Sequence, residues 1–511
     1  MTQSPSPTSS DSVSPEATST TAENSDRLRQ GRIAKLDEWE KRGVNPYPYH
    51  FEKSHNHAEL QTRYETLENS IETEDAVSVA GRVMALRNSG MFIDLQDPSG
   101  KIQLFSHKEN MSPEALEALK LVDIGDIIGA KGTIRRTPRG ELSIKCREIV
   151  MLGKSLLPLP EKYHGLTDIE IRYRQRYLDL IMNPESRDTL VKRSRIIAEI
   201  RRFLEARGFL EVETPMLQTL AGGAAAKPFI TKHNTLDMDM YLRIAPELYL
   251  KRLIVGGISE KVFELNRNFR NEGISPRHNP EFTMMELYQA YADYNDMMAL
   301  TEAIVETVAR VVLGTTKITY QNQELELAGP WPRRSMTDCV TEATGIDFAG
   351  LATDEEARAA AKKLGVHVEE RDTWGVALEK VFEVKIEHTL IQPVHITDYP
   401  RDISPLAKAH RDNPRLVERF ETRINGWEVA NAFSELSDPL DQRQRFEAQM
   451  TQRDKGDDEA HRLDEDYLTA LEYGMPPCGG LGIGIDRLIM LLTDSPNIRD
   501  VIAFPTLKPR S

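Results

Sequence analysis

The sequence predicts an α+β protein in which a small five-stranded β-barrel precedes a longer domain of sheet and helices. Between about Ala76 and Leu152, apolar and polar residues alternate, which is the period of a half-buried strand. From residue 191 onward, helical stripes and strand-like runs mix within one long region. A polar stretch with prolines, Leu157 to Asp168, separates the two, as expected at a domain boundary.

Composition and charge narrow the classes of protein further. With 40% hydrophobic and 28% charged residues, the chain is typical of a globular protein, and no apolar run reaches membrane-span length. The net charge of -15 argues against a general polyanion binder, so any nucleic-acid partner would need local basic patches. Cys146, Cys339 and Cys478 lack the spacing of metal sites, and we expect reduced thiols.

The N-terminal region divides at Arg27, the first basic residue. Residues 1–26 are rich in Ser, Thr and Pro with several acids, which predicts a disordered tail. A mitochondrial transit peptide would be rich in Arg and poor in acids, so we expect a cytoplasmic protein. Arg27 to Lys41 predicts an amphipathic helix with a basic face, which suits either solvent or RNA.

The barrel is predicted from alternating runs punctuated by turns. The runs include Val77–Val83, Met91–Leu95 and Leu142–Cys146, with turn signals at 98–100 and 138–140 and a helix at Pro113–Leu121. Some five strands with one helix favour a barrel of the oligonucleotide-binding (OB) kind. The fold alone would not establish binding.

Three segments of the second region could carry chemistry, and the first is a helix-to-strand unit. Val191 to Arg207 predicts a helix with one apolar stripe, ended by Gly208, and the following strand ends at Pro215. Read alone, this unit is typical of ordinary structure.

The second segment, Phe263 to Tyr291, predicts two strands around a loop rich in Gly and Pro. Glu286 and Tyr288 should share a face, because side chains two apart in a strand do so. Arg270 and Arg277 bracket the loop, which would suit a phosphate chain held between guanidinium groups. A charged surface hairpin is the alternative.

The third segment is the glycine run at 479–484, followed by Arg487 and an apolar helix. Glycines let the backbone approach a flat ligand closely, and Arg487 falls in the first helical turn. The run is neither a dinucleotide fingerprint nor a Walker loop, and tight packing is the alternative.

In this order the three segments resemble the signature motifs of class II aminoacyl-tRNA synthetases. Segments 222–224, 245–249, 269–273 and 433–436 resemble the lysyl-tRNA synthetase family within that class. The resemblance implies a homodimer, with an antiparallel sheet flanked by helices, that joins L-lysine to the 3' end of tRNA(Lys) using ATP. The expected organisation is a tail over 1–26, a helical segment over 27–72, an OB-fold anticodon-binding domain over 73–155, a linker over 156–190 and a class II catalytic domain over 191–511.

The resemblance also implies a lysine site: Gly223, Glu247, Arg270, Glu286, Tyr288, Asn431, Phe433 and Glu435. Gly223 and Glu247 would meet the α-amino group, Arg270 the α-carboxylate, and Tyr288 with Glu435 the ε-ammonium. The three glutamates independently suit a cationic amino acid, since an aspartate pocket would offer cations instead.

The implied ATP-binding residues are Arg270, Arg277, His278, Phe282, Glu421 and Arg487, and the implied Mg2+ ligands are Glu421 and Glu428. Arg270 and Arg487 would be catalytic by neutralising charge, because the attacking carboxylate is already ionised and needs no base.

The two metal carboxylates fall on a predicted hairpin that turns at Asn425-Gly426. Pairing Ile424 with Trp427 places Glu421 and Glu428 on one face, where hard oxygen ligands would suit magnesium. Strict alternation then turns Asn431, Phe433 and Glu435 away from Glu428, so one shared pocket requires a bulge or a strong twist. A solvated acidic hairpin is the alternative.

In the barrel, Phe92 and Gln103 match the family positions that stack on and hydrogen-bond an anticodon base. A buried Phe is the alternative. Local positive charge would come from Lys101, Lys131, Arg135, Arg136 and Arg139.

Two other functions are alternatives for this chain. A lysylase that modifies a protein would share the catalytic domain but lack the barrel. A non-catalytic regulator should have lost Arg270, Arg487 or the metal carboxylates, and none of these is missing.

Overall fold

The computed structural model describes residues 15–160, 166–224, 226–454 and 463–509. It divides into two compact units, Met1–Gly165 and Leu166–Ser511. Within the described residues, no helix is long and apolar enough to cross a membrane.

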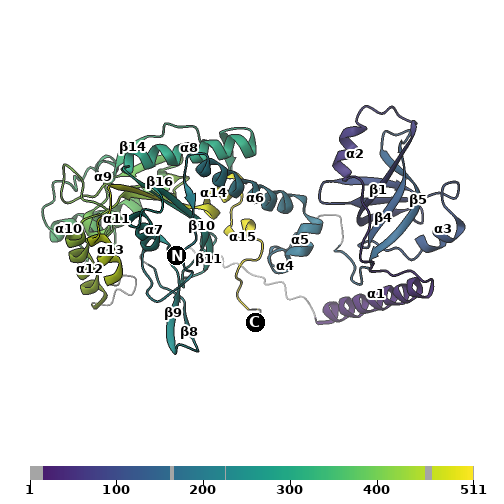
Figure 1. Ribbon diagram of the computed structural model, residues 1–511, viewed down its shortest axis with the longest axis horizontal. Coiled ribbons are helices and arrows are strands. Elements are labelled where there is room, and N and C mark those ends of the chain that lie inside the picture. Colours follow the sequence, from purple (N-terminus) through teal and green to yellow (C-terminus); the bar gives the residue numbers. More distant parts are fainter. Residues whose placement is uncertain (1–14, 161–165, 225, 455–462, 510–511) are drawn as a thin grey trace, which may run out of the picture. The chain divides into compact units, whose positions relative to one another are not determined.

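The first unit contains a closed five-stranded barrel with strand order β1-β2-β3-β5-β4 (Figure 1). Its elements are β1 (Glu72–Arg87), β2 (Phe92–Gln96), β3 (Lys101–Phe105), β4 (Ile127–Arg136), β5 (Leu142–Gly153), α2 (His57–Arg63) and α3 (Pro113–Leu119). Ile93, Leu95 and Leu104 point inward with no exposed surface, as alternation requires. Helix α3 lies between β3 and β4 in sequence and begins at a Ser112 cap. The predicted OB-type barrel is confirmed.

Helix α1 (Pro15–Lys41) begins earlier than the sequence predicts. It overlaps the expected tail over 1–26, of which residues 1–14 lie outside the described part of the chain. Two side chains of its basic face hold the helix to the barrel. Arg32 donates to the backbone carbonyl of Ser155 at 2.9 Å, and Lys35 pairs with Asp123 at 2.6 Å. These two cations therefore serve the fold.

The second unit is built on an eight-stranded sheet with order β14-β15-β16-β17-β18-β11-β10-β6. Neighbouring strands are antiparallel except for the pairs β14–β15 and β6–β10. The strands are β6 (Leu210–Glu211), β10 (Lys261–Phe269), β11 (Glu281–Ala290), β14 (Arg333–Ser335), β15 (Val394–Thr397), β16 (Arg419–Ile424), β17 (Trp427–Ser434) and β18 (Cys478–Gly484). The predicted α+β class with an antiparallel sheet is confirmed.

One face of this sheet forms the main core with helices α6 (Pro184–Glu205), α8 (Tyr294–Leu313) and α14 (Ile485–Leu492) (Figure 1). Leu481 and Ile483 of β18 point into this core. The alternate positions, Gly480 and Gly482, therefore point to the opposite face. That opposite face carries the site described below.

Helix α6 starts before residue 191, and α4 (Ile169–Arg174) and α5 (Arg176–Met182) precede it within the second unit. Much of the expected linker over 156–190 is thus folded against this domain. The cause is a buried ion pair: Arg176 is 1% exposed, bonds Asp179 at 2.6 Å and donates to the carbonyl of Ala503 at 2.9 Å. A contact with the C-terminal segment is not visible in local sequence.

The remaining α-helices and strands lie outside this sheet. They are β7 (Leu217–Gln218), β8 (Ile230–His233), β9 (Met238–Leu242), α7 (Glu247–Val255), β12 (Lys317–Tyr320), β13 (Gln323–Glu326), α9 (Met336–Thr344), α10 (Asp354–Lys363), α11 (Trp374–Lys385), α12 (Pro439–Asp454), α13 (Glu465–Glu472) and α15 (Ile498–Val501). Helices α9, α10 and α11 form a second core beside β15, which the sequence did not distinguish from the rest of the domain.

Candidate active site

The site lies on the adjacent strands β11, β18 and β17, and the middle strand, β18, presents two glycines to it. Gly480 of β18 pairs with Tyr288 on β11 and Phe433 on β17, and Gly482 pairs with Glu286 and Asn431. Because two glycines of β18 face the site, space is left above them between the side chains of β11 and β17. A Cβ on Gly480 would come within 2.7 Å of the Tyr288 ring and still closer to Glu435, so only glycine fits there.

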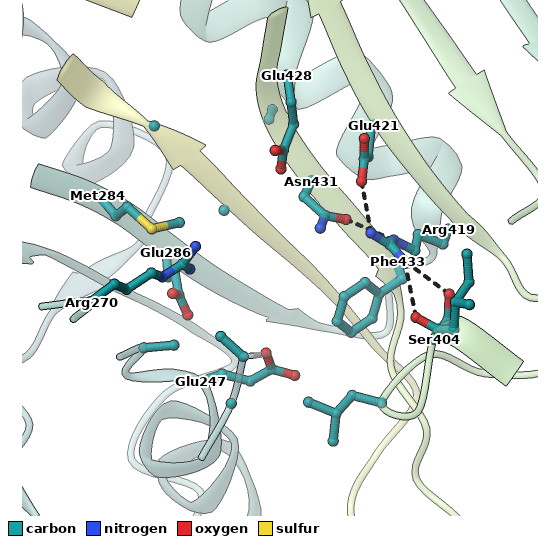
Figure 2. Close-up of a pocket in the computed structure, with 18 of the residues that line it drawn as sticks. Glu247, Arg270, Met284, Glu286, Ser404, Arg419, Glu421, Glu428, Asn431 and Phe433 are labelled. Carbon is teal, nitrogen blue, oxygen red and sulfur yellow. Dashed lines mark hydrogen bonds and ion pairs between the residues drawn. The ribbon is translucent and has the colours of Figure 1, made fainter. Parts of the chain in front are cut away.

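The two glycines line a cavity of about 750 Å³ (Figure 2). Its lining includes every residue predicted for lysine, ATP and metal: Gly223, Glu247, Arg270, Arg277, His278, Phe282, Glu286, Tyr288, Glu421, Glu428, Asn431, Phe433, Glu435 and Arg487. Segments more than two hundred residues apart in sequence thus meet in one place. The individual roles of these residues stay predictions.

A β-bulge brings the two halves of the hairpin to the same face. The hairpin turns at Asn425-Gly426 as predicted, with positive φ at both residues. Arg423 pairs with Glu428, but the next residue, Thr422, pairs with Ala430, which leaves one extra residue on β17. Asn431 consequently pairs with Glu421 and shares the face of Glu428, which strict alternation would forbid.

One end of the cavity is acidic. Glu247, Glu286 and Glu435 are 7%, 5% and 1% exposed. Burial, with a further contribution from Glu247, raises the pKa of Glu286 to about 8. The Tyr288 hydroxyl donates to the Glu286 carboxylate at 3.3 Å. Buried acids with few partners are suited to receiving a cation.

Lys251 is a buried cation at this acidic end that the sequence analysis missed. Its Nζ lies 2.6 Å from Glu247 Oε1 and forms a second ion pair with Glu435. The spacing of Glu247 and Lys251 on α7, four residues apart, is the signal that could have revealed the first pair. The second pair joins distant segments and has no local signal.

The cavity lining also carries cations, and one of them, Arg270, lies within electrostatic reach of both Glu286 and Glu428. The Arg270 guanidinium lies 5.2 Å from the Phe282 ring centroid, and Arg277 lies 5.0 Å from that of Trp427. Burial lowers the pKa of His278, and the nearby Arg487 guanidinium lowers it further, so the imidazole is neutral near pH 7. The guanidinium groups can hold anions, and the Phe282 ring can pack against a flat ring.

Arg487 is fixed in the first turn of α14 by two neighbours. It donates to the Glu428 carbonyl at 2.8 Å and to its carboxylate at 3.3 Å, and a second nitrogen lies 3.2 Å from His278 Nε2. Burial alone would raise the pKa of Glu428, but the guanidinium of Arg487 and those of neighbouring arginines hold it below the usual range. Glu428 is therefore ionised.

Arg419 connects the two predicted subsites and was also missed. Its guanidinium bonds Glu421 at 2.7 Å, the Asn431 side-chain oxygen at 3.1 Å and the Ser404 hydroxyl at 2.9 Å (Figure 2). Because the oxygen of Asn431 accepts from Arg419, its amide nitrogen is left to donate elsewhere.

The carboxylates of Glu421 and Glu428 stand on one face and supply the hard oxygen donors that magnesium prefers. Among the described residues, no group of three or more His, Cys, Asp or Glu side chains could hold a metal by itself. The donor set therefore fits an ion whose coordination is completed by phosphate oxygens and water.

The barrel carries the second predicted site on its outer face. Phe92 is half-buried beside Phe105, with ring centroids 5.4 Å apart, and is absent from the packed barrel core. Arg135 lies 4.6 Å from the Phe105 centroid, and Gln103 accepts a hydrogen bond from Ser143 at 3.0 Å. Phe105 and Arg135 thus extend an aromatic and basic surface around Phe92.

Comparison with known protein families agrees with this architecture. Residues 168–508 match the family of class II tRNA synthetases for D, K and N, and residues 77–152 match the OB-fold nucleic acid binding domain. Fold and cavity together define a class II aminoacyl-tRNA synthetase with an N-terminal OB domain.

Individual relatives narrow the class. The lysine--tRNA ligase of Sinorhizobium medicae is 58% identical over 91% of this chain and 93% of its own length. That of Agrobacterium fabrum is 56% identical over 97% of this chain and 99% of its own, and that of Trichormus variabilis 58% identical over 94% and 88%. The chain belongs to the lysine--tRNA ligase family, which confirms the resemblance expected from its sequence.

Proposed function

We propose that this protein activates L-lysine with ATP to form lysyl-adenylate and pyrophosphate, and then transfers the lysyl group to the 3' end of tRNA(Lys). The observation that carries this proposal is one cavity lined both by three buried carboxylates and by the cations Arg270 and Arg487. An amino acid with two ammonium groups and a polyanionic nucleotide need such opposite charges within one cavity.

In this proposal the acidic end orients lysine. Tyr288 and Glu435 receive the ε-ammonium, while Gly223 and Glu247 receive the α-amino group. Gly223 has a φ of 88°, and a Cβ there would lie 3.1 Å from that of Glu247, so glycine alone leaves room beside the acid. Arg270 then faces the α-carboxylate.

Adenylate formation is an in-line displacement. The ionised lysine carboxylate attacks the α-phosphorus of ATP, and the bond to the departing pyrophosphate breaks. Arg270 neutralises charge at the reacting phosphate, and Arg487 does so along the triphosphate. Glu421 and Glu428 would hold Mg2+, which when bound neutralises further phosphate charge. Positioning supplies the rest of the acceleration.

The barrel is proposed to bind the anticodon through Phe92 and Gln103, and the protein is proposed to act in the cytoplasm. A homodimer formed through the first motif is supported by exposed apolar side chains there: Val191, Leu210 and Leu217 are 42%, 41% and 48% exposed. Analytical ultracentrifugation of the full chain tests the dimer.

Pyrophosphate exchange measured separately with each of the twenty amino acids tests the proposed reaction. We expect strong ATP exchange with lysine alone, followed by lysine transfer to tRNA. Exchange with another amino acid would overturn the lysine assignment. Normal lysine exchange with transfer to a protein but not to tRNA would favour the lysylase alternative.

The affinity for lysine is expected to rise with pH. Below pH 8, protonated Glu286 cannot offer full negative charge to an ammonium group, so Kd for lysine should fall as pH increases from 6.5 to 8.5. Isothermal titration in two buffers of different ionisation enthalpy would detect the proton released on binding. Glu286→Gln should remove that release, and a pH-independent Kd in the wild type would contradict the prediction.

Phe92→Ala is expected to weaken tRNA binding about tenfold to a hundredfold, because one stacked base contributes roughly 1 to 3 kcal/mol. Lysine-dependent pyrophosphate exchange, which needs no tRNA, should stay near the wild-type rate. Aminoacylation at limiting tRNA should fall, and the loss should shrink for a tRNA with a changed anticodon.

Thermal unfolding distinguishes this role from packing. If Phe92 only filled space, truncation would leave a cavity, lower the melting temperature of the barrel and affect every tRNA alike. Ile149→Ala, at a partly buried position beside the barrel core, gives a matched control for loss of packing.

A further inference from the structure

The chain places its own lysine ammonium against the acids of the pocket proposed for a lysine substrate, just behind the cavity lining. Lys251, on α7, is fully buried and pairs with Glu247 and Glu435. Its Nζ lies 5.9 Å from the Tyr288 ring centroid and 5.4 Å from that of Phe433. All four neighbours belong to the proposed lysine site.

Glu435 has unused bonding capacity in spite of this pair. It is 1% exposed; its Oε2 contacts the Lys251 ammonium, and its Oε1 accepts no hydrogen bond from the described residues. A buried carboxylate needs both a counter-charge and hydrogen bonds. Lys251 supplies the charge and leaves room for a second donor.

The charges in the proposed lysine pocket balance only when Lys251 is counted. The acidic end is lined by three carboxylates, those of Glu247, Glu286 and Glu435, and the ammonium of Lys251 pairs with two of them. When all three carboxylates are ionised, two negative charges stay unmatched, and lysine brings two ammonium groups. Below pH 8, lysine binding must first release the proton of Glu286. With Arg270 opposite the substrate carboxylate, the filled pocket is neutral. Without Lys251 it would hold one buried negative charge too many.

Resting on the proposed function, we propose that Lys251 is a positioning residue for lysine: its ammonium keeps Glu247 and Glu435 ionised and aimed at the two ammonium groups of the substrate. Lys251 does not touch the reacting atoms. It sets the charge and geometry of the acids that bind the substrate.

The electrostatics around Lys251 support this role. Burial alone would lower the pKa of Lys251, but Glu247 and Glu435 raise it well above its usual value. Burial raises the pKa of Glu435, and the Lys251 ammonium opposes that rise. The charged and titratable groups around the pair are Glu247, Glu286, Tyr288, Arg419, Tyr467 and Cys478. Removing the Lys251 ammonium should therefore let Glu247 and Glu435 take up protons.

The test replaces Lys251 with methionine, which keeps the length of the side chain and removes the charge. We expect KM for lysine in pyrophosphate exchange to rise about 30-fold near pH 7, as when one partner of a buried charge pair is lost. KM for ATP should change less than about threefold. Because Glu247 and Glu435 would need higher pH to ionise, the defect should shrink between pH 7 and 8.5.

Arg252→Met is the matched control, since it removes the neighbouring cation of α7, which pairs with Asp464 at 2.7 Å outside the cavity. Its pH profile should match the wild type. If the Lys251→Met protein does not fold, Lys251→Arg decides, because it keeps the charge: a wild-type pH profile supports the proposal, and a displaced profile overturns it.

A folded Lys251→Met variant with unchanged KM for lysine, or with equal losses for lysine and ATP and an unshifted pH profile, overturns the role of Lys251 alone. Absence of lysine-dependent exchange in the wild type would instead overturn the proposed function, and the positioning role with it. Wild-type exchange measured first therefore separates the two failures.

Discussion

Replacing Arg487 with alanine is expected to slow lysine-dependent pyrophosphate exchange by about 100-fold to 1,000-fold, the usual cost of losing one preorganised charge donor at a reacting centre. Arg487 is held by the backbone and side chain of Glu428, yet 26% of its side chain stays exposed at the cavity. Its guanidinium is therefore fixed in place and free to meet a phosphate chain.

The protein should stay folded, because Asp486 rather than Arg487 anchors the start of α14. Asp486 accepts from the backbone of Thr283 at 2.7 Å and pairs with Arg193. Glu428→Ala should give a comparable loss of exchange. Arg443→Ala, which breaks a surface pair with Glu465, is the control for loss of an arginine.

Steady-state exchange should be read beside thermal unfolding and sedimentation. Near-normal exchange in Arg487→Ala would remove this residue from the ATP site. A large fall in melting temperature together with the activity loss would show that it supports the scaffold instead.

Sequence alone predicted the parts of the site that depend on local pattern. Alternation placed Glu286 and Tyr288 on one face, and the Asn425-Gly426 turn fixed the hairpin that carries Glu421 and Glu428. The need for a bulge followed from the positions of Asn431 and Glu428, although its place on β17 came only from the structure.

Features that depend on contacts between distant segments could not be predicted in this way. Lys251 meets Glu435, and Arg176 meets the carbonyl of Ala503, across long stretches of chain. Residues 156–190 have the local composition of a linker although much of the segment is folded. Lys251 gave no local sign that it lies beneath the lysine pocket. Such pairs are specified by the fold and leave no periodic signal.

The glycine run shows how a correct local inference can be incomplete. Its glycines predicted close approach to a flat ligand. The structure adds that Gly480 makes room for the Tyr288 ring and the Glu435 carboxylate, so the missing side chain also shapes the amino-acid end of the cavity.

Glu435→Gln is expected to weaken lysine binding by about 30-fold or more and to change ATP binding less than about threefold. The substitution keeps the shape of the side chain but removes the charge opposite the ε-ammonium. Lys251 would keep Glu247 as its partner at 2.6 Å, so even with Glu286 ionised the acidic end would hold one unmatched negative charge for two substrate ammonium groups.

Separate titrations of lysine and ATP, extended to norleucine, test this expectation. Norleucine lacks the ε-ammonium, so the wild type should bind it poorly and Glu435→Gln should narrow the preference for lysine over norleucine. Glu264→Gln is the matched control, because Glu264 is a buried acid paired with Arg243 at 2.6 Å that does not line the cavity. Its affinity ratio should equal that of the wild type. Equal effects of Glu435→Gln on lysine and ATP, or an unchanged preference for lysine, would mean that Glu435 does not receive the ε-ammonium and that the charge selecting the side chain lies elsewhere at the acidic end.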